Sequence, residues 1–170
     1  MRKIRWKEIA IIFQRAMNAL NPVMRVGDQI SKAILVHEPS VSTKEAFERA
    51  RKLLQLVGID PSRAENYPHE FSGGTSQRVM ITTALACNPK LPIADEPVSM
   101  LDVSIKGEIL KIMLKKREKH GTAILFITHD LSLARHICER IAILYLGKIV
   151  EIGGLKMLYV NQCIPTLKHS

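Results

Sequence analysis

The sequence is poor in several residue types and patterns, and each shortage argues against a class of protein. The three cysteines, Cys87, Cys138 and Cys163, form no Cys-x-x-Cys pair, so neither a disulfide framework nor a zinc site is indicated. No apolar run approaches the roughly 20 residues of a membrane-spanning helix, and the run at 9–13 is too short for a signal peptide core. The remaining composition, 46% hydrophobic and 24% charged over 170 residues, predicts a globular chain with one sizeable core.

The chain also lacks a concentrated basic segment, although its net charge is +9. Its Lys and Arg residues are spread over predicted helix faces such as 44–52 and 111–119, and few aromatic residues lie between them. That pattern is typical of a solvated surface. We therefore expect no nucleic acid among the partners.

A third absence concerns phosphate binding. The spelling G-x-x-x-x-G-K-[ST], which forms a loop around nucleotide phosphates, does not occur in the sequence. The nearest approach, Gly147-Lys148-Ile149, has different neighbours and lies in a predicted hairpin. The 170 residues therefore contain no recognisable phosphate-binding loop.

Hydrophobic periodicity and turn residues predict alternating strands and helices. Strands are predicted at 9–13, 91–95, 124–128, 141–146 and 148–152, and helices at 42–58, 72–87, 102–121 and 131–138. The helix at 42–58 begins with the capping box Ser42-x-x-Glu45 and ends at Gly58. This alternation predicts an α/β fold with a mostly parallel sheet.

Two adjacent carboxylates, Asp95 and Glu96, end the predicted strand at 91–95. The carboxyl edge of the sheet is the usual place for ligands in α/β folds. One carboxylate can hold Mg²⁺ while the other polarises the water that attacks a terminal phosphate. For an isolated Asp-Glu pair, a solvated strand end is the alternative.

Two further features point to an anion. Ser72-Gly73-Gly74 opens a predicted helix, where unpaired backbone N–H groups can approach a phosphate, although many helices begin this way for capping alone. His129 follows a predicted strand, and its ring nitrogen could hydrogen-bond a γ-phosphate. A lone histidine in that position is more often structural.

The order of these motifs resembles the nucleotide-binding subunits of ATP-binding cassette (ABC) transporters. Gln14 resembles the Q-loop glutamine, Ser72-Gly73-Gly74 the signature motif, 91–96 the Walker B strand, 99–102 the D-loop and His129 the switch histidine. The segments 20–24, 67–70 and 93–97 further resemble the oligopeptide, dipeptide and nickel importer branch.

The resemblance implies a partial P-loop NTPase fold of ABC type. It has a mostly parallel sheet and a helical lobe, and it lacks the N-terminal β lobe and the Walker A strand. Residues 1–170 would be one partial ATP-binding domain. Its parts would be the Q-loop, helical lobe and signature helix at about 15–88, the Walker B, D-loop and switch-histidine core at about 89–153, and a tail at 154–170. Loss of the Walker A strand would leave an unpaired strand edge and an apolar seam.

By the same resemblance, the chain would take part in binding ATP and Mg²⁺. Gln14 would contact Mg²⁺ and the attacking water, and Asp95 would hold the metal. The catalytic residues would be Glu96, as general base, and His129, as γ-phosphate ligand.

The nucleotide would lie between two head-to-tail subunits. Ser72, Gly73 and Gly74 would face the nucleotide of the partner subunit, and Asp102 would organise the dimer interface. Residues 18–71 would form the helical lobe that grips the transmembrane permease.

The implied function is that of an ATP-binding subunit, or a fragment of one, in an importer of peptides or nickel. The chain would be cytoplasmic and peripheral on the inner face of the cell membrane. Without a Walker A loop we expect no measurable ATP hydrolysis by the isolated chain, because phosphoryl transfer depends on positioning and electrostatics. As a fragment, the chain would be a truncated gene product, the product of a mis-assigned start, or a deliberate fragment. The alternative is a non-catalytic interaction protein that offers its signature face to an intact subunit or binds the permease.

The sequence departs from the pattern of the branch at several positions. Thr75-Ser76 stands where the branch usually has Met-Arg, Arg15-Ala16 where it has Asp-Pro, and Val98 where it has a small hydroxyl residue. Pro92 removes a hydrogen-bond donor from a predicted central strand. We therefore expect that strand to begin late or to be weakened.

Overall fold

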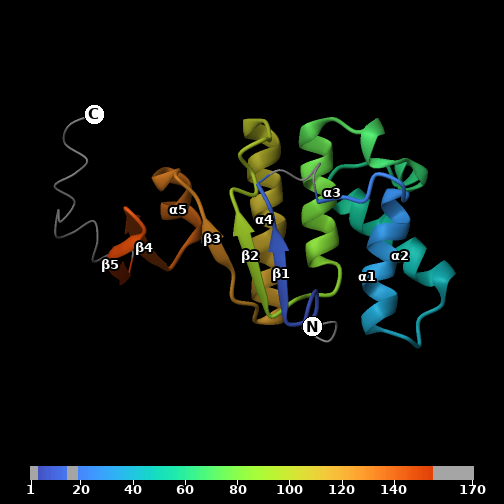
Figure 1. The fold of residues 1–170 in the computed structure, drawn as a ribbon, viewed down its shortest axis with the longest axis horizontal. Helices are drawn as coiled ribbons and strands as arrows, with labels where there is room; N and C mark the ends of the chain where they lie inside the picture. Colours follow the sequence, from blue (N-terminus) through green and yellow to red (C-terminus); the bar gives the residue numbers. More distant parts are fainter. Residues whose placement is uncertain (1–3, 15–18, 155–170) are drawn as a thin grey trace. The chain divides into compact units, whose positions relative to one another are not determined.

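The computed structural model describes residues 4–14 and 19–154 and divides the chain into two compact units, Met1–Ile127 and Thr128–Ser170. The first unit contains a sheet with helices, and the second contains a short helix and a hairpin (Figure 1). Among the described residues, no helix is long and apolar enough to cross a membrane. The subdivision near residue 88 stays a prediction. The segment Arg15-Ala16, and the predicted tail beyond Gly154 with Cys163, lie outside the described residues.

The first unit alternates strands and helices in the predicted α/β manner. Its elements are β1 (Ile9–Ile12), α1 (Val26–His37), α2 (Thr43–Leu56), the 3₁₀ helices η2 (Pro61–Glu65) and η3 (Pro68–Glu70), α3 (Gly73–Leu85), β2 (Leu91–Asp95), α4 (Val103–His120) and β3 (Leu125–Ile127). The strands form a parallel sheet in the order β1-β2-β3. Figure 1 shows α3 between this sheet and the α1–α2 pair, and α3 contacts β1, α1 and α2.

The two faces of this sheet differ in burial. Ala10, Ile12 and Ala94 are fully buried on the face that contacts α3. α4 lies near the same face, because its Met113 lines a hollow together with Pro92. On the opposite face, the aliphatic side chains of β1 and β3 are between 37% and 50% exposed: Ile9, Ile11, Leu125 and Ile127. Within the described residues β3 pairs with β2 alone, so its other edge is open.

Pro92 does not delay the start of the central strand, so the expected late start is wrong. β2 begins at Leu91, whose N–H donates to the Glu8 carbonyl at 2.8 Å on the β1 side. Successive residues of a strand face opposite neighbours, so the missing N–H of Pro92 faces the β3 side. There the pairing begins one residue later, at Ile93 with Leu125. The pairing of β2 with β1 and β3 is therefore intact despite the proline.

Of the helices α1 and α2 in the first unit, only α2 was predicted from the sequence. α2 begins as predicted, with the Ser42 hydroxyl accepting from the Glu45 N–H at 3.2 Å. α1 was not predicted, and its N-cap residue, Arg25, makes no side-chain capping bond. A bidentate ion pair joins the two helices, with Arg49 donating to Glu38 at 2.6 and 2.9 Å.

The second unit contains α5 (Leu131–Ile137) and an antiparallel hairpin of β4 (Arg140–Tyr145) and β5 (Lys148–Gly154). The hairpin turn has positive φ at Leu146 (46°) and Gly147 (75°), a combination that matches the right-handed twist of the flanking strands. This hairpin and its glycine were predicted from the sequence.

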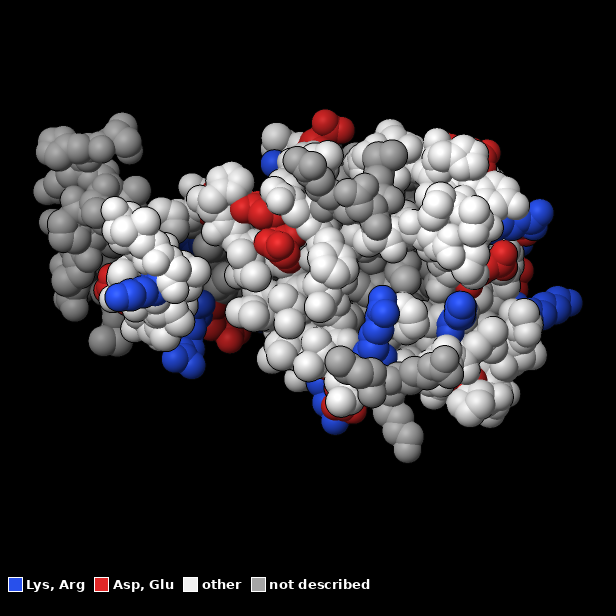
Figure 2. All heavy atoms as spheres, viewed as in Figure 1, with Lys and Arg blue, Asp and Glu red and all other residues white. Residues whose placement is uncertain are grey.

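Charged side chains are dispersed on the face of the first unit that Figure 2 draws. Figure 2 shows Lys and Arg side chains separated by wide uncharged areas on the face drawn. Several described basic residues form ion pairs, among them Arg49 with Glu38 and Lys90 with Glu8.

Candidate functional site

The Ser-Gly-Gly turn opens α3. Ser72 is the N-cap, and its hydroxyl accepts from the Thr75 N–H at 3.4 Å. Gly73 and Gly74 form the first turn of this 13-residue helix. The positive end of the helix therefore lies where the sequence predicted an anion-binding turn.

The predicted D-loop packs against this turn. A Cβ added to Gly74 would lie 3.3 Å from the Met100 carbonyl oxygen and 3.5 Å from Leu101 Cδ2. A Cβ on Gly73 would meet only the flexible end of Met100, at 3.8 Å. Asp102 is exposed at the N-cap position of α4 and makes no side-chain capping bond. The structure thus brings the predicted signature and D-loop segments together.

The exit of β1 is bound to α3 as well. The amide of Gln77, which is only 1% exposed, donates to the Phe13 carbonyl at 3.0 Å. The Phe13 N–H donates to the sulfur of Met80 at 3.1 Å. Gln14 follows directly and is exposed. The predicted Q-loop glutamine therefore follows a residue that is bonded to α3, the helix that begins at the predicted signature turn.

The predicted Walker B carboxylates lie at the carboxyl end of the central strand. Asp95 is the last residue of β2, is half-buried and pairs in register with Ile127. Glu96 has φ +47°, a left-handed conformation that is costly for a residue with a Cβ. Its N–H donates to the Ile127 carbonyl at 3.0 Å, and its carbonyl accepts from the Ser99 hydroxyl at 2.9 Å. Such strain occurs most often at functional sites.

His129 belongs to the second unit, where it is exposed just before α5. Its neighbour Asp130 caps that helix, because the carboxylate accepts from the Leu133 N–H at 3.0 Å. The Asp130 N–H in turn donates to the Thr128 hydroxyl at 3.1 Å. The role of His129 as a γ-phosphate ligand stays a prediction, since His129 lies in a different unit from the end of β2.

The donor set at the end of β2 fits Mg²⁺ only together with a phosphate. Among the described residues, no group of three or more His, Cys, Asp or Glu side chains could hold a metal ion. Mg²⁺ is often bound through one or two carboxylates, with water and phosphate oxygens completing its shell. Asp95, half-buried at the strand end, could supply such a carboxylate, and Gln14 an amide oxygen.

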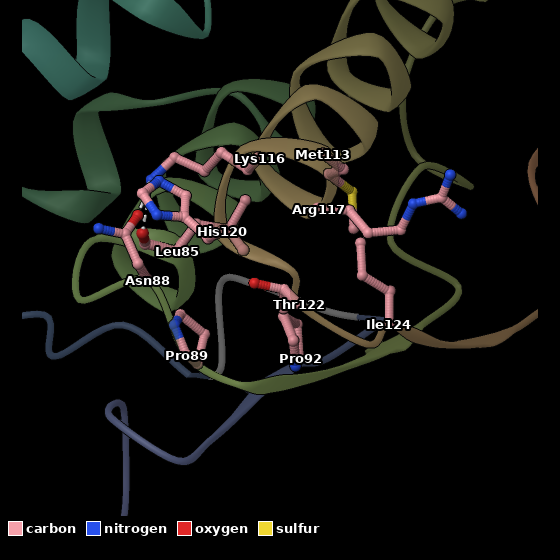
Figure 3. A pocket seen from close by; sticks show the side chains of 10 residues that line it. All are labelled: Leu85, Asn88, Pro89, Pro92, Met113, Lys116, Arg117, His120, Thr122 and Ile124. Carbon is pink, nitrogen blue, oxygen red and sulfur yellow. Dashed lines mark hydrogen bonds between the residues drawn. The ribbon is translucent and has the colours of Figure 1, made fainter.

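A small hollow in the first unit lies between α3, β2 and α4 (Figure 3). Its volume is about 10 Å³, room for about one water molecule, so it cannot hold a nucleotide. Lys116 fills its rim and donates to the Leu85 carbonyl and to Asn88 Oδ1, both at 2.8 Å. Burial lowers the pKa of Lys116. Its two hydrogen bonds cap the C-terminal end of α3.

A larger hollow is an open groove of about 350 Å³ on the α1–α2 pair. It is lined by Asp28, Ser31, Lys32, Leu35, Val36, Thr43 and Phe47. Its lining combines apolar side chains with the charged Asp28 and Lys32. The residues from α1 were not predicted, although Ile30 and Ile34 are spaced as on one helix face.

Arg78 is a further residue that the sequence analysis did not assign to the site. Its guanidinium donates to the carbonyls of Val57 and Gly58 at 3.0 and 2.9 Å, and to Thr75 Oγ1 at 3.2 Å. Burial lowers its pKa. Only the spacing of Arg78, one helical turn after Thr75, was a visible signal in the sequence.

Comparisons of the sequence with known proteins identify a family and several relatives. A family model described as "ABC transporter" matches residues 1–99. A probable peptide ABC transporter ATP-binding protein of Sinorhizobium fredii is 47% identical over 167 residues, which cover 97% of this chain and 50% of that protein. The oligopeptide transport ATP-binding protein OppD of Bacillus subtilis is 48% identical, with 97% and 46% covered. The chain thus spans about half the length of the curated relatives it matches.

Solved structures give the same picture. The ATP-binding cassette MJ0796, in a dimeric post-hydrolysis state bound to ADP and Pi, superposes with a TM-score of 0.81 at 31% identity. The match covers 90% of this chain and 65% of that one. The protein cbiO1 of Clostridium perfringens, part of the ABC transporter complex cbiONQ, gives a TM-score of 0.72 at 26% identity, covering 91% and 60%.

Proposed function

This chain belongs to the ABC transporter family of ATP-binding proteins, and on that premise we propose that it serves the ATPase of a peptide importer. In this proposal the chain supplies the signature side of a composite ATP site, which a second nucleotide-binding subunit completes. ATP binding closes the two subunits, and closure drives the permease. The relatives named for peptide or oligopeptide transport favour peptides over nickel as the solute.

The packing around the signature turn is the observation that supports the proposal most directly. Gly74 leaves just enough room for the Met100 carbonyl, so the signature turn and the D-loop share one surface. Gln77 and Met80 hold the Q-loop exit to the same helix. A single displacement of α3 would therefore move all three segments together.

The carboxyl end of β2 has the chemistry for the metal and water steps of the reaction. Asp95 and Gln14 would hold Mg²⁺, which when bound neutralises charge on the phosphate oxygens during phosphoryl transfer. Glu96, fixed by the Ile127 and Ser99 hydrogen bonds, would accept a proton from the attacking water. His129 would donate a hydrogen bond to the γ-phosphate. These roles apply to a site that has a phosphate-binding loop. The G-x-x-x-x-G-K-[ST] spelling of such a loop does not occur in the 170 residues.

The α1–α2 groove is the surface that we propose for the permease. Its lining includes the apolar Phe47, Leu35 and Val36 and the charged Asp28 and Lys32. An amphipathic cytoplasmic segment of a membrane protein could bury apolar side chains there and pair its charges at the rim. This contact would hold the chain on the inner face of the cell membrane.

Turnover of MgATP by mixtures tests the proposal. The chain is mixed with an intact nucleotide-binding subunit, such as the Bacillus subtilis relative. We expect extra turnover in the mixture that is lost in the Ser72→Ala and Gly73→Asp variants, and no turnover by the chain alone. Equal turnover in the mixture and in the intact subunit alone would contradict a catalytic contribution.

A second candidate is a non-catalytic interaction protein, favoured by the absence of a G-x-x-x-x-G-K-[ST] spelling. In this case the chain binds the intact subunit or the permease without adding turnover. Measuring association and turnover in the same mixtures separates the two: binding without a gain in turnover supports the second candidate.

A further inference from the structure

A line of hydrogen bonds runs from the end of α2 to the hydroxyl of Ser72. Arg78 donates to the carbonyls of Val57 and Gly58 and to Thr75 Oγ1, and Thr75 Oγ1 lies 2.9 Å from Ser72 Oγ. We propose that Thr75 is a positioning residue: held by Arg78, its hydroxyl orients the Ser72 hydroxyl so that the Ser72 hydrogen points outward, toward a phosphate. The inference rests on the proposed function, because the phosphate belongs to the composite ATP site.

Arg78 is well anchored for this task. Its two carbonyl partners lie at the C-terminal end of α2, where the helix dipole favours a positive charge. Gly58 has φ +71°, and a Cβ there would lie 3.3 Å from Arg78 Nη1. The glycine therefore permits both the end of α2 and the close approach of the guanidinium. Arg78 can only donate, so Thr75 Oγ1 must accept from it.

The direction of the bond between the two hydroxyls follows from their burial. Thr75 is buried, and its Oγ1 already accepts from Arg78. If Ser72 donated to Thr75, the Thr75 hydrogen would need another acceptor inside the protein, and a buried hydrogen without one is costly. If Thr75 donates to Ser72, its hydrogen is satisfied. The Ser72 oxygen then accepts twice, because it also accepts from the Thr75 N–H.

The consequence concerns the Ser72 hydrogen. Ser72 is exposed, so a hydrogen that is not used inward is available to solvent or to an anion at the start of α3. The charge of Arg78 polarises the Thr75 hydroxyl, which strengthens its donation to Ser72. A methionine at position 75 could not make these bonds, because its side chain has no hydrogen to donate. This relay, the line of hydrogen bonds from Arg78 through Thr75 to Ser72, therefore depends on this chain's own threonine.

The test compares two substitutions of one residue. Thr75→Val keeps the shape and removes the hydroxyl, whereas Thr75→Ser keeps the hydroxyl. Thr83→Val is the matched control, because it removes from the same helix a hydroxyl that donates to the Val79 carbonyl. MgATP affinity is measured in the mixture with the intact subunit, after circular dichroism has confirmed that each variant is folded.

We expect about fivefold weaker MgATP affinity in Thr75→Val, the factor that a lost hydrogen bond of about 1 kcal/mol gives. Thr75→Ser and Thr83→Val should keep the original affinity. In a Ser72→Ala background, Thr75→Val should cause no further loss, because the relay acts through Ser72. Unchanged affinity in Thr75→Val, or an equal loss in both backgrounds, would overturn the proposal.

A measurement on the chain alone keeps the two proposals separate. If the mixture forms no composite site, the proposed function fails, and scalar couplings in the NMR spectrum then decide the relay. The relay is supported if Ser72 has one χ1 rotamer in the original chain and in Thr75→Ser, and averages over several χ1 rotamers in Thr75→Val. Averaging in the original chain refutes it.

Discussion

Gly27, in the first turn of α1, allows α1 to approach α2 and η2 closely. A Cβ at this position would lie 2.5 Å from Phe47 Cε2 and 2.9 Å from the Ala64 carbonyl oxygen. Real Cβ atoms do not come so close, so Gly27→Ala must shift an aromatic ring and a backbone segment. Overpacking of this kind costs about 1–3 kcal/mol, and the gain in helix propensity returns only about 0.5–1 kcal/mol.

With a backbone oxygen among the clashing atoms, we expect a net loss of about 2 kcal/mol in Gly27→Ala. For a chain of this size that loss lowers the Tm by about 4–8 °C. Gly107→Ala is the matched control: Gly107 is exposed in α4, and its added Cβ would meet no atom within 4 Å. This control should be more stable than the original chain by about 0.5–1 kcal/mol.

The assay is urea unfolding followed by circular dichroism, with the free energies of both variants compared at equal m values. If Gly27→Ala were as stable as Gly107→Ala, the close packing of α1 on Phe47 would be refuted. Because Phe47 also lines the α1–α2 groove, Gly27→Ala should weaken permease binding as well.

Three further predictions concern the same unit. Burial raises the pKa of Cys87 to about 11, so its alkylation rate should be slow at pH 8 and rise up to about pH 11; rapid modification of the folded chain at pH 8 would contradict this. Arg49 lowers the pKa of Glu38, so the pair stabilises the fold above the unfolded pKa and loses this effect as pH falls through the folded pKa. Glu38→Gln should therefore cost about 0.5–1 kcal/mol at pH 7, with the difference shrinking below pH 4.5 in unfolding experiments. Gly58→Ala, strained by its positive φ and crowding Arg78, should lower the Tm, whereas an unchanged Tm would argue against that contact.

The sequence predicted the elements that carry local signals. Ser42 and Glu45 marked the start of α2, and Gly147 marked the hairpin turn, because capping and positive φ depend on a few adjacent residues. α1 was missed because Arg25 at its N-cap gives no capping signal. The effect of Pro92 was misjudged because it depends on which neighbour the missing N–H faces, and the sequence does not state the sheet order.

The candidate site was predictable as a set of motifs and their order. Its internal contacts were not. Gln77 and Phe13 are 64 positions apart, and Arg78 and Gly58 are 20 apart, so only the packing of the chain brings them together. The left-handed conformation of Glu96 likewise could not be predicted, because a glutamate in the sequence does not indicate backbone strain.

ATP-dependent association of this chain with an intact nucleotide-binding subunit, measured by sedimentation velocity, tests the central claim most directly. We expect a complex in the presence of MgATP that is absent without nucleotide and absent in the Gly73→Asp variant. A folded chain that sediments separately from the intact subunit at saturating MgATP would contradict the claim that Ser72, Gly73 and Gly74 complete an ATP site.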